Sequence, residues 1–279
     1  MIMETQVQSR FNYRFSNNFK KEEITSSLAK YGIAVIENYL SDEEIENLRD
    51  ESTKLLNEKD ESRLEKNESV LKKSTINSLD KKKFPMITTL PKSEFFTYVA
   101  KDFFDPFPFI VPLAYIHRDV NKIDFNGAWH QDPQTSVKFY IYLNDVNEKN
   151  GALRYNIGSH REGYYRMMYK RHTGDTFPTF GIPEEELLNA EDIYGKAGTI
   201  IVFNPIGAHT AGQIQKGAER FVIRFHYTAL RPKSLMKRGW YKLWRTPFNP
   251  VKPLISRDEF YSQKHKSLDF HLNEMKKHE

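Results

Sequence analysis

The 279-residue chain contains no cysteine. Disulfide bonds, thiolate metal ligands and a cysteine nucleophile are therefore excluded. The chain also lacks any apolar run of about 18 residues, the length that a membrane-spanning helix needs. Its first residues lack the apolar core of a signal peptide. We therefore expect a cytoplasmic protein without a transmembrane segment.

A strong charge imbalance is also missing, because the formal net charge is only +5. Such a charge permits acidic partners but does not indicate nucleic acid. Neither an internal repeat nor a low-complexity boundary divides the chain. We expect a single domain over residues 1–279, with a core at about 107–230, N-terminal support at 20–106 and a C-terminal extension at 231–279.

The N-terminal third predicts helices around one short strand. Residues 20–31 are typical of a helix, and residues 32–37 of a strand. A second helix begins at Ser41, because Glu44 three residues later completes a capping box. Residues 84–104 are predicted to include a helix that covers the core.

Two polar stretches are harder to assign. Residues 57–83 are rich in lysine and glutamate, which predicts a solvated helix or a mobile loop. Residues 161–192 form a long polar and aromatic insertion between strands, a common place for a substrate loop.

The central region predicts strands. From Val137 to Leu143 apolar residues alternate with Lys138, Tyr140 and Tyr142, as on a strand with two distinct faces. A turn at Asn150-Gly151 is predicted to join this strand to an antiparallel return strand. Further strands are predicted at residues 107–116, 151–157, 198–203 and 220–227. Several short strands without regular intervening helices indicate an antiparallel sandwich.

His130-Gln131-Asp132 stands just before the alternating strand. On an extended backbone the histidine and the carboxylate point the same way, and together they suit a divalent metal such as Fe(II). The same spacing occurs at His117-Arg118-Asp119, and His160-Arg161-Glu162 is a variant with glutamate. The pattern alone does not choose among these three.

A third ligand should come from a distant strand, because one extended strand cannot wrap three ligands around a metal. His209 follows a buried strand and fits this role. Arg220 lies eleven residues later (220 − 209), at the start of the next strand. Its guanidinium fork suits the far carboxylate of a dicarboxylic acid bound to the metal.

These segments resemble the phytanoyl-CoA dioxygenase family of Fe(II)- and 2-oxoglutarate-dependent oxygenases over roughly residues 30–230. The resemblance rests on WHQD, on YIYLNDVNEKNGALRYNIGSH, on GTIIVFNPIGAHTAG followed by Arg220, and more loosely on YGIAVIENYLSDEEIENLR. It implies a mainly β fold with flanking helices, a double-stranded β-helix of the cupin-like jelly-roll type. It also implies Fe(II), 2-oxoglutarate and O2 as cofactors, with His130, Asp132 and His209 as metal ligands and Arg220 binding 2-oxoglutarate.

The resemblance extends to weaker assignments. Relatives often place an aromatic residue beside the cosubstrate where this chain has Tyr140, and Lys138 shares its face. The family often has a hydroxyl residue two places after the distal histidine. Here Ala211 stands at that position, with Thr210 adjacent as the hydroxyl that would contact the cosubstrate.

The remaining candidates are interpreted as structural. His117-Arg118-Asp119 lacks the downstream context of the second motif and is set aside as a ligand pair, although His117 and Arg118 can reach the pocket from a neighbouring strand. His160 is interpreted as a structural residue. Arg224 shares the face of Arg220 and is interpreted as part of a structural ion pair, with substrate binding as the alternative.

The resemblance implies hydroxylation of an unactivated C–H bond of a small-molecule substrate, with release of succinate and CO2. Related halogenases carry a small residue where Asp132 stands, so halogenation is not expected. Two alternatives stay open. One is a non-redox jelly-roll metal enzyme such as an isomerase or hydrolase, and the other is an inactive binding module that uses the basic tail.

That tail, residues 231–245, mixes basic residues with Trp240, Tyr241 and Trp244. Packing of these aromatics on the core is the preferred interpretation. Weak contact with an anionic membrane surface is an alternative, and no nucleic-acid partner is expected. The sequence predicts neither the substrate nor the oligomeric state.

Overall fold

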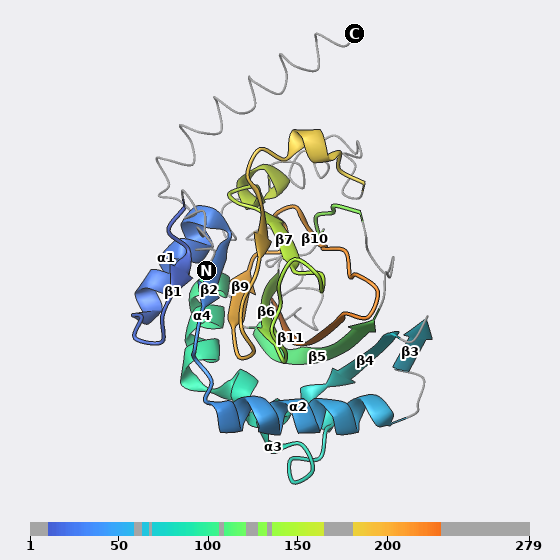
Figure 1. Ribbon diagram of the computed structural model, residues 1–279. Helices are drawn as coiled ribbons and strands as arrows, with labels where there is room; N and C mark the ends of the chain where they lie inside the picture. The colour runs from blue at the N-terminus through green and yellow to red at the C-terminus, as the bar shows by residue number, and fades with distance from the viewer. Residues whose placement is uncertain are drawn as a thin grey trace, which may run out of the picture.

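Two β-sheets face each other in the computed structural model, which describes residues 11–58, 63–66, 69–105, 109–120, 128–132, 136–164 and 181–229 (Figure 1). The larger sheet has the strand order β1-β2-β9-β6-β11-β5-β4-β3, and the smaller sheet has the order β10-β7-β8. The strands are β1 (Arg14–Phe15), β2 (Ile33–Ile36), β3 (Arg63–Lys66), β4 (Ser69–Thr75), β5 (Phe109–Val120), β6 (Ser136–Tyr142), β7 (Leu153–Asn156), β8 (Ala190–Ile193), β9 (Ile200–Phe203), β10 (His209–Ala211) and β11 (Glu219–Ala229).

Helices cover the outer face of the larger sheet (Figure 1). They are α1 (Lys21–Tyr31), α2 (Asp42–Asn57), α3 (Pro85–Thr89) and α4 (Glu94–Phe104), with the 3-10 turns η1 (Ile76–Ser78) and η2 (Leu90–Lys92). A third 3-10 turn, η3 (Glu184–Glu186), lies beside the smaller sheet. The predicted fold class, a mainly β jelly roll with flanking helices, is confirmed.

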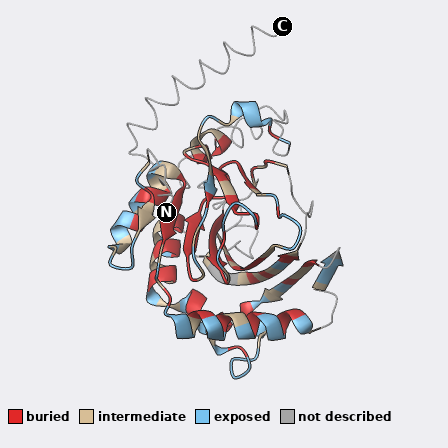
Figure 2. Cartoon of the chain, in the orientation of Figure 1, coloured by how far each residue is buried: buried red, intermediate tan, exposed pale blue. Residues whose placement is uncertain are grey.

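Strand β6 lies between the two apolar layers of the molecule. As the alternation predicted, Val137, Phe139 and Ile141 pack into the core under the helices, whereas Tyr140 and Tyr142 pack into the layer between the sheets. Phe96 of α4 stacks on Phe139 with 4.5 Å between ring centroids. Such an aromatic pair contributes about 1 kcal/mol beyond its buried area. Figure 2 shows buried residues along β6 and on the inner sides of the helices.

Helix α2 begins as predicted at Ser41. The Ser41 hydroxyl accepts a hydrogen bond from the Glu44 backbone N–H at 3.3 Å, and the Glu44 carboxylate accepts one from the Ser41 N–H at 2.9 Å. The helix buries Ile45, Leu48 and Leu55 against the sheet and leaves its charged face in water. The cap therefore fixes where the helix that supports the larger sheet begins.

The prediction of a solvated helix or loop at residues 57–83 is wrong for residues 63–66 and 69–75. Strands β3 and β4 form an antiparallel pair there, and β4 adds to the sheet beside β5. Lys72 is buried, and its ammonium donates to the Glu58 carbonyl at 2.9 Å. Backbone pairing with β5 stabilises β4, and a charge pattern does not reveal such pairing.

The predicted hairpin of β6 and β7 does not form. Gly151 has the positive φ of a turn, but β6 pairs with β9 and β11, whereas β7 pairs with β8 and β10 in the other sheet. The Tyr142 hydroxyl donates to the Ile193 carbonyl at 2.7 Å and accepts from the Leu153 N–H at 3.1 Å. The connection therefore crosses between the sheets, because a local turn signal does not determine which sheet the next strand joins.

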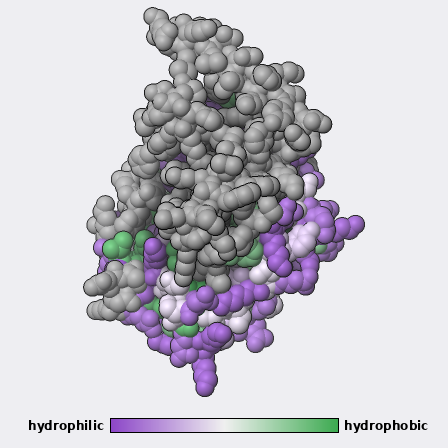
Figure 3. All heavy atoms as spheres, turned by 180° about the vertical axis from the view of Figure 1, so that it is seen from behind, coloured by the Kyte–Doolittle hydropathy of each residue, from purple (hydrophilic) through white to green (hydrophobic). Residues whose placement is uncertain are grey.

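Some predicted segments lie wholly or partly outside the described residues. These include residues 165–180 of the insertion and the basic tail at 231–245. The described end of the insertion contributes β8, which pairs with β7. None of the described helices is long and apolar enough to cross a membrane. On the face shown in Figure 3, the described surface at the base of the molecule is largely hydrophilic.

Candidate metal centre

His130, Asp132 and His209 converge between the two sheets. One ligand atom from each lies within 4.8 Å of the other two. His130 pairs with His209, the first residue of β10, through backbone hydrogen bonds of 3.1 and 2.9 Å. The Asp132 N–H donates to the Pro205 carbonyl at 2.7 Å. Backbone pairing thus brings together residues that are 79 positions apart (209 − 130).

Both histidine rings are oriented by nearby carbonyl groups. His130 Nδ1 lies 3.0 Å from the Ala128 carbonyl oxygen, and His209 Nδ1 lies 2.9 Å from that of Gly207. These contacts place the proton on Nδ1 of each ring, so Nε2 carries the lone pair that a metal binds. The ring centroids are 4.3 Å apart.

Asp132 forms an ion pair with Lys138 of β6. Its Oδ2 atom lies 2.6 Å from Lys138 Nζ, whereas its Oδ1 atom lies 3.9 Å from His130 Nε2. Lys138 therefore holds one carboxylate oxygen, and the other faces the imidazole. This orientation matters for a metal site, because contacts to a ligating carboxylate fix its direction.

The protonation states agree with a cation site. Burial lowers the pKa of His130 and holds the pKa of His209 well below its usual range, so both rings are neutral at pH 7. Burial alone would raise the pKa of Asp132, but the Lys138 ammonium brings it below its usual value. Burial lowers the pKa of Lys138 to about 8, and Arg224 contributes. Two neutral imidazoles and one carboxylate fit Fe(II) and leave coordination positions for other ligands.

Arg220 is buried and held in one orientation. Its Nε and Nη2 atoms donate to Asp119 Oδ2 at 3.1 and 2.6 Å, and Nη1 donates to the Gly151 carbonyl. A guanidinium carries five N–H groups. These three contacts leave two N–H groups, on Nη1 and Nη2, for a carboxylate ligand.

Asp119 is a site residue that the sequence analysis missed. It belongs to the motif at 117–119 that was set aside as a ligand pair, and it lies directly opposite Arg220 in the pairing of β5 with β11. A carboxylate on an apolar strand two positions after a histidine was the available signal. To recognise that Asp119 holds Arg220, one must know the register between two strands whose paired residues are 101 positions apart.

Tyr140 lies on the inner face of β6, as predicted, and is only 6% exposed. It is directly opposite Arg224 of β11. Thr210 follows His209 on β10 and pairs with Arg154, so its side chain points to the opposite face of the strand from the His209 ring. The contact between Thr210 and the cosubstrate stays a prediction.

The other candidate residues, Arg118, His117 and His160, have different surroundings. Arg118 points outward to Glu219 at 2.8 Å, whereas His117 lies on the inner face of β5 opposite Val222. His160 is fully buried, and its Nε2 atom lies 3.0 Å from the Ala29 carbonyl oxygen, a structural contact as predicted.

The structural ion pair predicted for Arg224 is absent among the described residues. Its guanidinium instead lies over the Tyr115 ring, 4.9 Å from the centroid.

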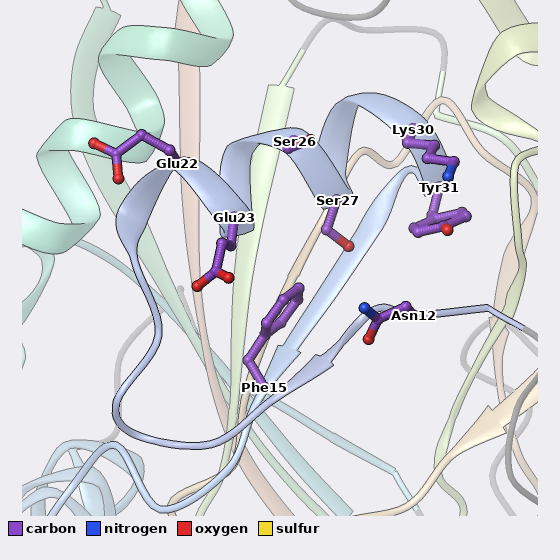
Figure 4. Close-up of a pocket in the computed structure, with 8 residues that line it drawn as sticks. All are labelled: Asn12, Phe15, Glu22, Glu23, Ser26, Ser27, Lys30 and Tyr31. Carbon is purple, nitrogen blue, oxygen red and sulfur yellow. The ribbon is translucent and has the colours of Figure 1, made fainter.

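A separate pocket lies at the surface against α1 (Figure 4). Its lining comes from α1 and the segment before it, including Phe15, Glu22 and Tyr31. None of the predicted site residues borders this pocket.

A jelly roll in which two histidines and one aspartate meet between the sheets defines the class of non-haem metal oxygenases. Residues 112–222 match the family model described as phytanoyl-CoA dioxygenase. This match confirms the predicted resemblance of the central part of the chain to that family of Fe(II)- and 2-oxoglutarate-dependent oxygenases. The group of His130, Asp132 and His209 agrees with the predicted cofactors, while the roles of the individual site residues stay predictions.

Several solved structures have the same fold as this chain. HygX from Streptomyces hygroscopicus with nickel and 2-oxoglutarate bound is 15% identical, with a TM-score of 0.53 over 76% of this chain and 91% of that chain. EctD from S. alaskensis with 2-oxoglutarate and 5-hydroxyectoine is 17% identical, with a TM-score of 0.56 over 80% of each chain.

The epimerase SnoN, in complex with Fe3+, alpha ketoglutarate and nogalamycin RO, is 14% identical, with a TM-score of 0.57 over 78% of this chain and 88% of that chain. At these identities the likeness establishes the fold. No curated protein matches the chain in sequence.

Proposed function

We propose that this protein is an Fe(II)- and 2-oxoglutarate-dependent dioxygenase that hydroxylates an unactivated C–H bond of a small molecule. The observation that carries the proposal is the convergence of His130, Asp132 and His209 between the sheets, with both Nδ1 atoms already bound to carbonyl groups. An aspartate in the ligand set also leaves no room for a halide, so hydroxylation is preferred to halogenation.

Iron and 2-oxoglutarate, when bound, supply the oxidising chemistry that consumes O2 and releases succinate and CO2. The chain itself positions the groups. His130, Asp132 and His209 would hold the metal, and Lys138 fixes the Asp132 carboxylate by its 2.6 Å ion pair. Fixing a ligand in this way reduces the reorganisation that metal binding requires.

Arg220 would bind the far carboxylate of 2-oxoglutarate through its two remaining N–H groups. Asp119 and Gly151 hold the guanidinium before any ligand arrives, so little side-chain entropy is lost on binding. Tyr140 on the adjacent strand would border the cosubstrate. The apolar layer between the sheets, which includes Tyr142 and Phe203, excludes water on this side.

The experiment measures succinate formed from 2-oxoglutarate, with Fe(II) and O2, in wild type and in Asp132→Ala. The variant should lose turnover and bound iron together, because a carboxylate ligand is removed. Asp42→Ala changes an aspartate at the start of α2 and serves as the matched control. A wild-type protein active with Zn(II) and without 2-oxoglutarate would instead identify a non-redox metal enzyme.

Two further proposals concern the setting of the enzyme. A cytoplasmic location is supported by the lack of cysteine, and cell fractionation would test it. The proposed partner is a small-molecule substrate and not nucleic acid, which a filter-binding assay with RNA and DNA would check. Weak contact between residues 231–245 and an anionic membrane would appear as vesicle binding that salt removes.

A further inference from the structure

The inner faces of β6 and β11 carry three positively charged side chains between the sheets. Lys138 of β6 and both Arg220 and Arg224 of β11 are on this face, because the strand register places them opposite other inward residues. Arg224 lies in the middle strand, directly opposite Tyr115 on one side and Tyr140 on the other. The side chains of the three cations therefore share the inner face of the larger sheet.

Within the part of the chain that the structure describes, only two of these cations have an acidic partner. Lys138 is paired with Asp132 at 2.6 Å, and Arg220 is paired with Asp119 at 2.6 Å. Arg224 makes no ion pair or hydrogen bond with any residue in the described ranges, and its Nε atom is buried without an acceptor there. Its guanidinium lies over the face of Tyr115, 4.9 Å from the ring centroid.

Two imidazoles stand beside Arg224 with unused hydrogen-bonding atoms. The His226 ring is 4.5 Å from the Tyr115 ring, and His117 lies on the inner face of β5. Nε2 of each is buried and has no hydrogen-bond partner in the part of the chain that the structure describes. Burial lowers the pKa of both rings, and Arg224 lowers it further, so both are neutral and each has one ring N–H to donate.

With iron and 2-oxoglutarate bound, the charges of the site leave one cation without a counter-charge. This charge count rests on the proposed function. The metal and the 2-oxoglutarate dianion cancel, as do Asp132 with Lys138 and Asp119 with Arg220. The positive charge of Arg224 remains. A half-buried guanidinium without a counter-charge is unfavourable unless a ligand supplies one.

We propose that the substrate of this enzyme carries an anionic group that binds to Arg224, with His117 and His226 donating further hydrogen bonds. A guanidinium that stacks on a tyrosine presents its N–H fork to a planar anion. One surplus positive charge matches a carboxylate monoanion better than a phosphate dianion. The substrate is therefore an organic acid, held by its carboxylate while a carbon further along faces the metal ligands.

The test uses the full chain loaded with Ni(II) and 2-oxoglutarate. Because Ni(II) replaces Fe(II), this protein can bind ligands without turning them over. The probes are straight-chain and aromatic carboxylates, the amides and amines with the same carbon skeletons, and the matching alkyl phosphates. Binding is measured by calorimetry. Carboxylates should bind more tightly than their amides and amines, and Arg224→Gln should weaken them roughly tenfold or more.

The matched control is Arg118→Gln, an outward-facing arginine on β5 that pairs with Glu219. It should leave carboxylate binding unchanged, and Arg224→Lys should retain part of it. Affinity for 2-oxoglutarate should change less than about threefold in Arg224→Gln, because the proposal assigns that ligand to Arg220.

Three outcomes would overturn the proposal: amides that bind as well as acids, an Arg224→Gln variant that keeps its acid binding, or no acid binding at all. Loss of 2-oxoglutarate binding in Arg224→Gln would also overturn it and place Arg224 in the cosubstrate subsite. Tighter binding of alkyl phosphates would keep the anionic group but change its identity. A wild-type protein that fails to bind 2-oxoglutarate with Ni(II) would refute the proposed function itself, which separates the two failures.

Discussion

Two His-x-Asp motifs lie thirteen residues apart (130 − 117) and have different surroundings. The first is within β5, so His117 and Asp119 lie along one strand, where Asp119 meets Arg220. The second lies outside a continuous strand, where His130 bridges to His209 and Asp132 bonds to Pro205. The backbone around a His-x-Asp motif, more than the spacing of its residues, therefore decides whether the side chains converge with a third ligand.

The largest expected effect separates the two motifs by metal binding. His130→Ala should abolish stoichiometric Fe(II) binding and lower turnover at least about a thousandfold, since one of three ligands is lost. His117→Ala should leave the iron content intact. Iron per chain after desalting measures both, and equal iron loss in the two variants would contradict the assignment.

The next prediction concerns Asp119, whose proposed role is to position Arg220. Asp119→Ala removes the partner of a buried guanidinium and should cost about 3–5 kcal/mol of unfolding free energy. Asp119→Asn keeps the shape and should instead raise the KM for 2-oxoglutarate with little change in iron content. Denaturant titration and KM measurements test these effects, and an unchanged KM in Asp119→Asn would remove the positioning role.

A third prediction concerns the residue that supports the second motif. Lys138→Met keeps much of the side-chain length but removes the ion pair with Asp132. Metal affinity should fall about 10- to 100-fold, as is typical when a contact to a ligating residue is lost. Competition with a chelator measures this affinity, with Lys149→Met at an exposed turn as the control.

The smallest effect on metal binding is expected at the third motif, His160-Arg161-Glu162, where the prediction concerns stability. Burial, with a smaller contribution from the charge of Arg161, lowers the pKa of His160 to about 4 from its usual 6.5. The neutral ring thus favours folding above pH 6.5, and this stability should be lost as the pH falls from 6.5 to about 4. The loss is on the order of 3 kcal/mol. Urea titrations of wild type and His160→Gln across this range would show it, and parallel curves would exclude His160 as the source.

Local patterns in the sequence were enough to predict several elements. Period-two alternation placed Phe139 and Tyr140 on opposite faces of β6, and the Ser41–Glu44 box located the start of α2, because both depend on neighbouring residues alone. The segment around His209 was also identified, since it follows a buried strand. These signals need no knowledge of which strands pair.

The features that were missed all depend on long-range pairing. Strand β4 is stabilised by β5, and the connection after β6 enters the other sheet. The pairing of Asp119 with Arg220 follows from the register of β5 on β11, as does the position of Arg224 opposite Tyr115 and not opposite an acidic residue. The side-chain direction of Thr210 likewise follows only once β10 is known to be a strand.

The backbone bridge between His130 and His209 has a consequence for how the metal is exchanged. Because two peptide hydrogen bonds hold these ligands together, the chain pays most of the ordering entropy of the site when it folds and not when the ion arrives. Metal loading should therefore be fast and reversible on the folded protein. A chelator should then yield an apoprotein that keeps its fold and accepts iron again without renaturation.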